Sequence, residues 1–131
     1  MNKSTTIFLA DDDADDRFLL TEALKSIDPT IKVVERENGQ ELLAALLSQI
    51  LPKKSLIILD MNMPKMNGLE TLANLRGIPA LASVPAVMLS TSGNSQMIEI
   101  AKQLGAIDYF VKPSTMDGLL DLSRKLIGDL S

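Results

Sequence analysis

Several acidic residues, one serine and one lysine stand at the ends of short apolar runs, and their types suit phosphate and metal chemistry. They are Asp11, Asp12 and Asp13 after residues 6–10, Asp60 after 56–59, Ser90 after 86–89, and Lys112 after 108–111. If the runs are parallel strands, these side chains meet at one edge of the sheet. Carboxylates at such short range repel each other unless a cation compensates them. Mg²⁺ prefers oxygen ligands and is typically held by one or two carboxylates with a phosphate.

The pattern therefore predicts a magnesium site that uses Asp11 and Asp12. Asp15 and Asp16 are expected instead to be solvated acids in the first turn of a helix, where the helix dipole favours negative charge.

Asp60 is the candidate nucleophile of the chain. An ionisable side chain directly after Leu56 to Leu59 is costly unless it has a use. A carboxylate can attack phosphorus and form an acyl phosphate. That step needs positive charge and hydrogen-bond donors around the phosphoryl oxygens. Lys112 and Ser90 are the available donors.

The composition excludes several other classes of function. The 131 residues include no cysteine and no histidine, which removes disulfides, thiolate chemistry and the usual zinc ligands. The net charge of -4 argues against direct nucleic-acid binding. The longest apolar run, Leu42 to Leu47, is far below the roughly 18 to 20 residues that cross a bilayer. Residues 1–10 lack a secretory signal, so we expect a cytoplasmic protein with no membrane insertion.

The elements that must position these residues alternate along the chain. Strands are predicted at 6–10, 32–36, 56–60, 86–90 and 108–111, and helices at 16–27, 40–51, 68–76, 95–104 and about 115–130. Continuous apolar strands favour burial on both faces. We expect one domain over residues 1–131, of the α/β class: a (βα)₅, doubly wound, parallel five-stranded sheet with the flavodoxin-like strand order 2-1-3-4-5.

The chain resembles the response-regulator receiver domains of two-component systems over essentially its full length. Residues 60–68, Asp-Met-Asn-Met-Pro-Lys-Met-Asn-Gly, are similar to the family's loop D-x-x-M-P-x-M-x-G. Residues 105–113, Gly-Ala-Ile-Asp-Tyr-Phe-Val-Lys-Pro, are similar to its G-A-x-D-Y-x-x-K-P block. An acidic pair after the first strand and a hydroxyl after the fourth complete the likeness, which is greatest to single-domain regulators of the chemotaxis type.

The resemblance implies a role for each matching position. It makes Asp60 the phosphoacceptor, Asp12 a direct metal ligand, Asp11 a water-mediated one, the Asn62 carbonyl a third metal contact, and Ser90 and Lys112 the groups that bind phosphoryl oxygens. The metal would be Mg²⁺.

The resemblance also implies a conformational switch that involves Ser90 and Tyr109, and a cis peptide bond between Lys112 and Pro113. A plain strand aromatic is the alternative for Tyr109. Thr91 and Ser92 depart from the residues frequent in the family, and together with Asn62 they are expected to tune hydrolysis of the acyl phosphate.

The implied partners are proteins. A sensor histidine kinase or histidine phosphotransfer protein would supply the phosphoryl group, because the chain has no histidine of its own. We expect a signalling phosphoacceptor and not an enzyme with a separate substrate. Phosphorylation would alter a docking surface on residues 95–130 for an unidentified downstream protein, and the chain would be a monomer or weak dimer.

Four alternatives explain fewer residues. Asp11, Asp13, Asp15 and Glu22 match ligand positions of an EF-hand, but the required glycine is replaced by Asp16 and a strand precedes the loop. A phosphatase with Asp11 and Asp13 in a D-x-D motif leaves Asp60 without a role. A non-catalytic module would have lost site residues that are intact here, and flavin mononucleotide binding lacks its phosphate loop.

Overall fold

The computed structural model describes residues 5–128 of the chain. Within them, the strands are β1 (Thr6–Ala10), β2 (Lys32–Arg36), β3 (Ser55–Asp60), β4 (Ala86–Ser90) and β5 (Asp108–Val111). The helices are α1 (Ala14–Ile27), α2 (Gly39–Leu47), α3 (Gly68–Gly77), α4 (Ser95–Gln103) and α5 (Met116–Gly128). The strands form one parallel sheet in the order β2-β1-β3-β4-β5, so the predicted fold class and strand order are confirmed.

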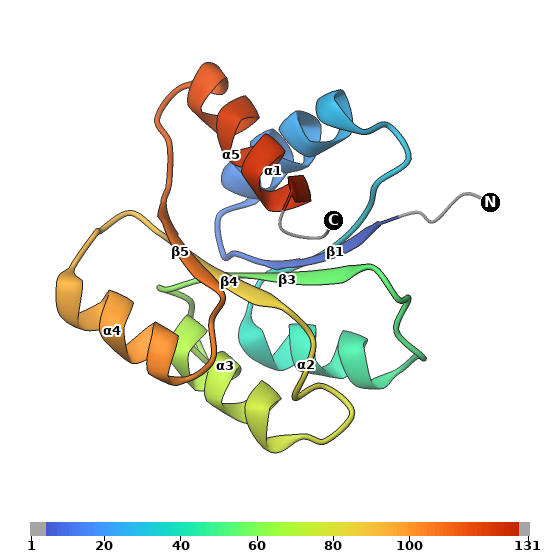
Figure 1. Ribbon diagram of the computed structural model, residues 1–131, viewed down its shortest axis with the longest axis vertical. Coiled ribbons are helices and arrows are strands. Elements are labelled where there is room, and N and C mark those ends of the chain that lie inside the picture. Colours follow the sequence, from blue (N-terminus) through green and yellow to red (C-terminus); the bar gives the residue numbers. More distant parts are fainter. Residues whose placement is uncertain (1–4, 129–131) are drawn as a thin grey trace.

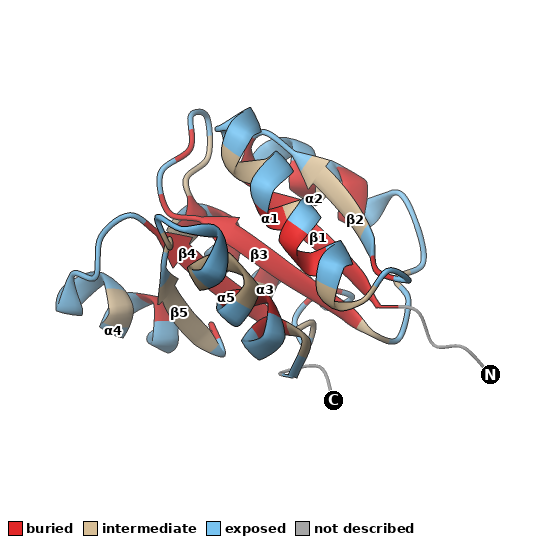
Figure 2. Cartoon of the chain, turned by 90° about the horizontal axis from the view of Figure 1, so that it is seen from above, coloured by how far each residue is buried: buried red, intermediate tan, exposed pale blue. Residues whose placement is uncertain are grey.

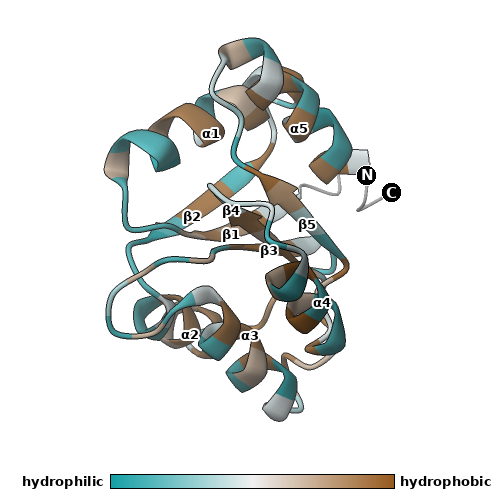
Figure 3. Cartoon of the chain, turned by 90° about the vertical axis from the view of Figure 1, so that its left-hand side faces the viewer, coloured by the Kyte–Doolittle hydropathy of each residue, from teal (hydrophilic) through white to brown (hydrophobic). Residues whose placement is uncertain are grey.

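Helices cover both faces of the sheet. Figure 1 shows α1 and α5 on one face and α2, α3 and α4 on the other. Side chains of successive strand residues point to opposite faces, so β1 and β3 contribute to two separate cores. Phe8 and Ile57 pack toward α2 and α3, whereas Ile7 and Ile58 pack toward α1 and α5. Figure 3 shows the apolar strands enclosed between these two helical layers.

Burial on both faces is confirmed for the three central strands and is wrong for the two edge strands. Every residue of β1, β3 and β4 is buried, whereas β2 and β5 are partly exposed (Figure 2). Each edge strand has a neighbour on one side only, which leaves its outer side chains less covered.

Two helix boundaries differ by more than one residue from the predicted ones. Helix α1 begins two residues early because Asp13 caps it, accepting hydrogen bonds from the backbone N–H groups of Asp15 and Asp16. Helix α2 ends at Leu47, not at 51. The side chains of Ser48 and Gln49 donate hydrogen bonds to the Ala45 carbonyl at this end, and Pro52 disfavours helical backbone only at residue 51. Helix α5 is described to Gly128, and its predicted end at 130 lies outside the described residues.

The other boundaries follow the predicted ones closely. Helix α4 ends before Gly105, whose φ of 96° suits the left-handed end of a helix. None of the helices in residues 5–128 has the length and apolarity needed to span a bilayer.

Candidate functional site

Asp11 lies directly after β1 and is held firmly in place. Its backbone N–H donates to the carbonyl of Arg36 at 3.1 Å, which extends the pairing of β1 with β2 by one residue. Its carboxylate accepts a hydrogen bond from the N–H of Asp13 at 2.9 Å, and its carbonyl accepts one from the Arg17 guanidinium at 2.6 Å. Only 2% of Asp11 is exposed. The loop thus presents a buried and well-ordered carboxylate at the strand end.

Asp12 and Asp13 take different roles although they are neighbours. Asp12 is exposed, and one of its carboxylate oxygens lies within 4.8 Å of ligand oxygens of both Asp11 and Asp60. The carboxylate of Asp13 is committed to capping α1. This geometry leaves Asp13 outside the acidic cluster and weakens the D-x-D alternative. The order of strand, loop and helix also fails to match an EF-hand, which has a helix on each side of its loop.

Asp60 is the last residue of β3 and is almost fully buried, with 4% of its surface exposed. It pairs with Leu89 of β4, and the next residue, Met61, donates its N–H to the Leu89 carbonyl at 3.1 Å. The Asp60 carboxylate accepts a hydrogen bond of 3.4 Å from the N–H of Asn62. Burial and then the neighbouring Asp11 carboxylate raise the pKa of Asp60 from 3.8 to about 7, and the Lys112 ammonium offsets only part of this.

Lys112 follows β5 and brings an ammonium group to the same acids. Its backbone N–H donates to the Ser90 carbonyl at 2.7 Å, which continues the pairing of β4 with β5. Its Nζ lies 2.9 Å from the carboxylate of Asp11, 2.9 Å from that of Asp16 and 3.5 Å from that of Asp60. Burial alone would lower the pKa of Lys112, but the hydrogen bonds to Asp11 and Asp16 outweigh it and raise the pKa above its usual value.

Ser90 and Tyr109 lie on β4 and β5, the two strands that follow β3 in the sheet. Ser90 is buried at the end of β4, and its hydroxyl oxygen accepts a hydrogen bond of 3.2 Å from the N–H of Ser92. Ser90 and Tyr109 line a cavity of about 280 Å³. Its other lining residues are Met61, Asn62, Asn67, Leu69, Ser92, Asn94 and Met97. The Tyr109 hydroxyl donates to the Ser92 carbonyl at 2.8 Å. Thr91 and Ser92 are exposed beside this cavity.

The carboxylates of Asp11, Asp12 and Asp60 form a group that suits a hard divalent cation. All three offer oxygen atoms, and these lie close enough together to share one ion. Burial and then the Asp11 carboxylate raise the pKa of Asp60, and the Lys112 ammonium does not cancel the two effects. A divalent cation would supply the missing positive charge.

The structure corrects two sequence-based predictions about the site. The Lys112–Pro113 bond is trans, since residues 5–128 contain no cis peptide bond, and trans is the intrinsically favoured form. Asp16 was expected to be only a solvated helix acid, but it binds Lys112. The pattern of strand ends gave no signal for this contact, because Asp16 lies in the first turn of a helix and not at the end of a strand.

Most of the other predicted site residues converge. Asp11, Asp12 and Asp60 form the acidic group, and Lys112 contacts Asp11 and Asp60. The cavity beside Ser90 is lined by Asn62, Ser92 and Tyr109, whereas Thr91 is not among its lining residues. Strand ends from four strands therefore contribute to one site.

Residues 7–124 match the family model described as the response regulator receiver domain. The chain belongs to this family. Receiver domains are phosphoacceptors of two-component signal transduction, and the chain is therefore a signalling phosphoacceptor domain. The family is phosphorylated by histidine kinases or histidine phosphotransfer proteins.

Relatives with solved structures cover nearly the whole chain. The phosphorylated cyanobacterial phytochrome response regulator RcpA is 30% identical, with a TM-score of 0.87 over 97% of this chain and 94% of that one. Response regulator Rcp1 of Synechocystis sp. is 30% identical over 125 residues, 92% of this chain and 85% of its own length. The Mn²⁺-bound form of Rcp1 has a TM-score of 0.78 over 92% of this chain and 90% of that one.

Some relatives are much longer enzymes. Protein-glutamate methylesterase/protein-glutamine glutaminase 2 of Vibrio vulnificus is 36% identical over 120 residues, which are 87% of this chain and 32% of that protein. The chain thus spans about a third of the length of the methylesterases that it matches.

Proposed function

We propose that the chain accepts a phosphoryl group on the Asp60 carboxylate from a phosphohistidine of a sensor histidine kinase or phosphotransfer protein. One observation carries this assignment. Asp60 ends a buried strand, its carboxylate is grouped with those of Asp11 and Asp12, and the Lys112 ammonium lies 3.5 Å from it. The family's phosphoacceptor role and the phosphorylated form of RcpA support it.

The transfer needs the side chains of this site, a phosphodonor and the divalent cation proposed below. An Asp60 carboxylate oxygen attacks the phosphorus atom, the phosphorus–nitrogen bond of the phosphohistidine breaks, and the imidazole keeps the electron pair. The Lys112 ammonium and the Ser90 hydroxyl donate hydrogen bonds to the transferred oxygens. Water later attacks the same phosphorus and releases inorganic phosphate and the free carboxylate. No separate substrate is turned over, so the domain is not an enzyme in the ordinary sense.

Mg²⁺ is the cation that we propose for the acidic group. Asp12 would bind it directly, Asp11 through water, and Asp60 and the Asn62 carbonyl would complete the protein ligands. The Mn²⁺-bound form of Rcp1 supports a divalent cation, and the oxygen-only donor set favours Mg²⁺. When bound, the ion neutralises charge that develops on the transferred phosphoryl group.

Ser90 and Tyr109 would report phosphorylation to the surface. Ser90 moves toward the phosphoryl group, and Tyr109 then changes position in the cavity that both residues line. The arrangement in which both residues have moved has a different surface on α4, β5 and α5, and a downstream protein docks to this surface. Asn62, Thr91 and Ser92 border the path of attacking water and set the lifetime of the acyl phosphate.

The test is phosphorylation by acetyl phosphate, followed by intact mass. With Mg²⁺, the wild-type protein should gain one phosphoryl group, and chelation of Mg²⁺ should prevent it. Asp60→Asn should abolish the adduct, whereas Asp28→Asn at the far end of α1 should retain it. An adduct that survives Asp60→Asn would contradict the assignment, and turnover of a phosphate ester by that variant would favour the phosphatase alternative.

A further inference from the structure

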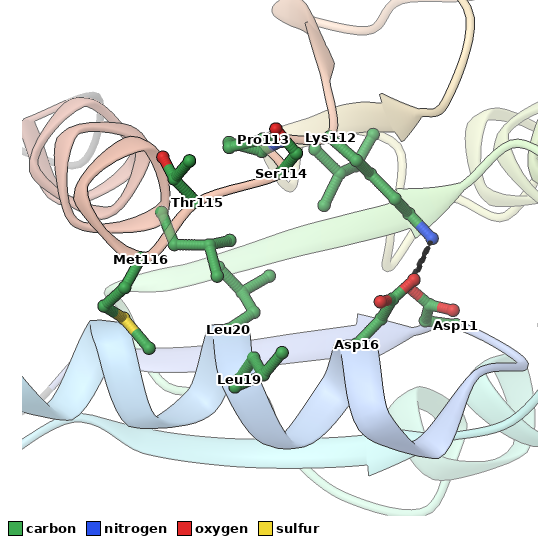
Figure 4. Close-up of a pocket in the computed structure, with 11 residues that line it drawn as sticks. Asp11, Asp16, Leu19, Leu20, Lys112, Pro113, Ser114, Thr115 and Met116 are labelled. Carbon is green, nitrogen blue, oxygen red and sulfur yellow. Dashed lines mark hydrogen bonds and ion pairs between the residues drawn. The ribbon is translucent and has the colours of Figure 1, made fainter.

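Asp16 reaches an ammonium group that is otherwise enclosed. It lies in the first turn of α1, and its carboxylate accepts a hydrogen bond from Lys112 Nζ at 2.9 Å (Figure 4). Its side chain is 42% exposed, whereas that of Lys112 is 14% exposed. The contact therefore joins the partly exposed carboxylate of Asp16 to the mostly buried ammonium of Lys112.

The ammonium of Lys112 is shared unevenly among three carboxylates. It has three N–H donors, and its two short contacts, both 2.9 Å, go to Asp11 and Asp16. The carboxylate of Asp60 lies farther away, at 3.5 Å. The group that must serve the phosphoacceptor is therefore bound more closely by two other acids.

These two acids differ in what a cation would do to them. Asp11 belongs to the acidic group with Asp12 and Asp60. A divalent cation bound there would partly neutralise the Asp11 carboxylate and so weaken its attraction for the Lys112 ammonium. Asp16 is outside that group. Its attraction for Lys112 therefore persists after the cation is bound.

We propose that Asp16 is a positioning residue that competes with Asp60 and its phosphoryl group for the ammonium of Lys112. The inference rests on the roles proposed above for Asp60 and Lys112. Because Asp16 is partly exposed, water can solvate its carboxylate once the ammonium leaves, so the competition weakens phosphoryl binding without preventing it. Loss of the Asp16 carboxylate would make the full charge of Lys112 available to the phosphoryl oxygens.

The surroundings leave Lys112 room to change its contacts. The Lys112–Asp16 pair forms one end of a cavity of about 300 Å³ between α1 and the loop before α5 (Figure 4). Its apolar lining comes from Leu19, Leu20, Leu89, Pro113, Met116 and Leu119. On the side of Asp16, the ammonium therefore borders open space and not packed side chains.

The test measures the affinity for beryllofluoride, a phosphoryl mimic, by calorimetry at saturating Mg²⁺. Asp16→Asn should bind it about three- to tenfold more tightly than wild type, which corresponds to one exposed charge-assisted hydrogen bond. The rate of phosphorylation by acetyl phosphate should rise in parallel. Asp16→Glu keeps the carboxylate and should stay near the wild-type affinity.

Asp15→Asn is the matched control. Asp15 is the preceding residue in the same helical turn, is exposed, and makes none of the ion pairs of Lys112. If Asp15→Asn and Asp16→Asn change the affinity equally, or Asp16→Asn lowers it, competition for Lys112 is wrong and the inference is overturned. In a Lys112→Gln background, Asp16→Asn should have no such effect, and a persisting gain would also overturn it.

The underlying assignment fails in a different way. If wild-type protein binds no beryllofluoride with Mg²⁺, both the site assignment and the inference are overturned. Normal wild-type binding that Asp16→Asn does not strengthen overturns the inference alone.

Discussion

Gly68 lies directly against the backbone carbonyl oxygen of Asp60, so closely that a Cβ atom at position 68 would overlap with it. The same Cβ would lie 2.6 Å from the terminal methyl carbon of Met88. The N–H of Gly68 also donates to the carbonyl of Met61 at 3.1 Å. The first residue of α3 therefore holds the turn that follows Asp60 and helps to fix the direction of its carboxylate.

Gly68→Ala is therefore expected to damage both stability and the site. The overlap with backbone atoms forces a shift at the end of β3 that should lower the free energy of unfolding by about 1–3 kcal/mol. Phosphorylation by acetyl phosphate should slow as Asp60 is displaced. Gly77→Ala in the last turn of α3 is the control, because a Cβ there meets nothing within 4 Å. Equal effects of the two variants in urea unfolding would contradict this explanation.

The Tyr109 hydroxyl ties β5 to the loop between β4 and α4 through its hydrogen bond to the Ser92 carbonyl. Tyr109→Phe should lower the free energy of unfolding by about 0.5–1.5 kcal/mol, the usual contribution of such a bond. Hydrogen exchange of amides in residues 91–94 should become faster, since the loop loses this anchor. Mg²⁺ affinity should not change, because Tyr109 is outside the acidic group. Unchanged exchange in this loop would show that the bond does not hold it.

The sequence predicted most of the site because the fold carries strand ends to one place. Asp11, Asp60 and Lys112 each follow an apolar strand, and parallel pairing brings such positions to the same edge. A single sequence could therefore identify which residues meet, and the resemblance to receiver domains suggested their roles. The single-domain organisation and the residue roles stay predictions.

What the sequence could not predict depends on side-chain geometry. Asp15 and Asp16 share a residue type and a helical turn, and only the packing of α1 beside α5 and the loop before it directs the second toward Lys112. Asp13 was left out of the predicted metal site, and its role as the cap of α1 became visible only in the structure. The directions of these acidic side chains depend on the packing of the folded chain, which residue types alone do not reveal.

Lys65 occupies a strained position in the turn between β3 and α3. Its φ of 65° lies in the left-handed region, and the Met66 N–H donates to the Pro64 carbonyl at 2.7 Å around it. Lys65→Gly should relieve this strain and raise the free energy of unfolding by about 0.5–1 kcal/mol, after the entropy of the more flexible unfolded chain is subtracted. Lys53→Gly, at an exposed loop residue without positive φ, should instead lower it. Urea unfolding of both variants tests the difference, and a loss in Lys65→Gly would contradict it.

The raised pKa of Asp60 predicts how stability depends on pH in cation-free buffer. The ordinary pKa of 3.8 describes the unfolded chain, and the folded protein has a pKa of about 7, so folding takes up a proton between these values. The stabilising contribution is full below about pH 4 and is lost as the pH rises through about 7. The Asn side chain of Asp60→Asn does not ionise, so the variant keeps its stability as the pH rises. At pH 8 its free energy of unfolding should be about 1–3 kcal/mol higher than that of wild type, measured by urea unfolding with chelator present. Mg²⁺ should stabilise wild type more than the variant, and a pH-independent difference between the two proteins would show that Asp60 ionises normally.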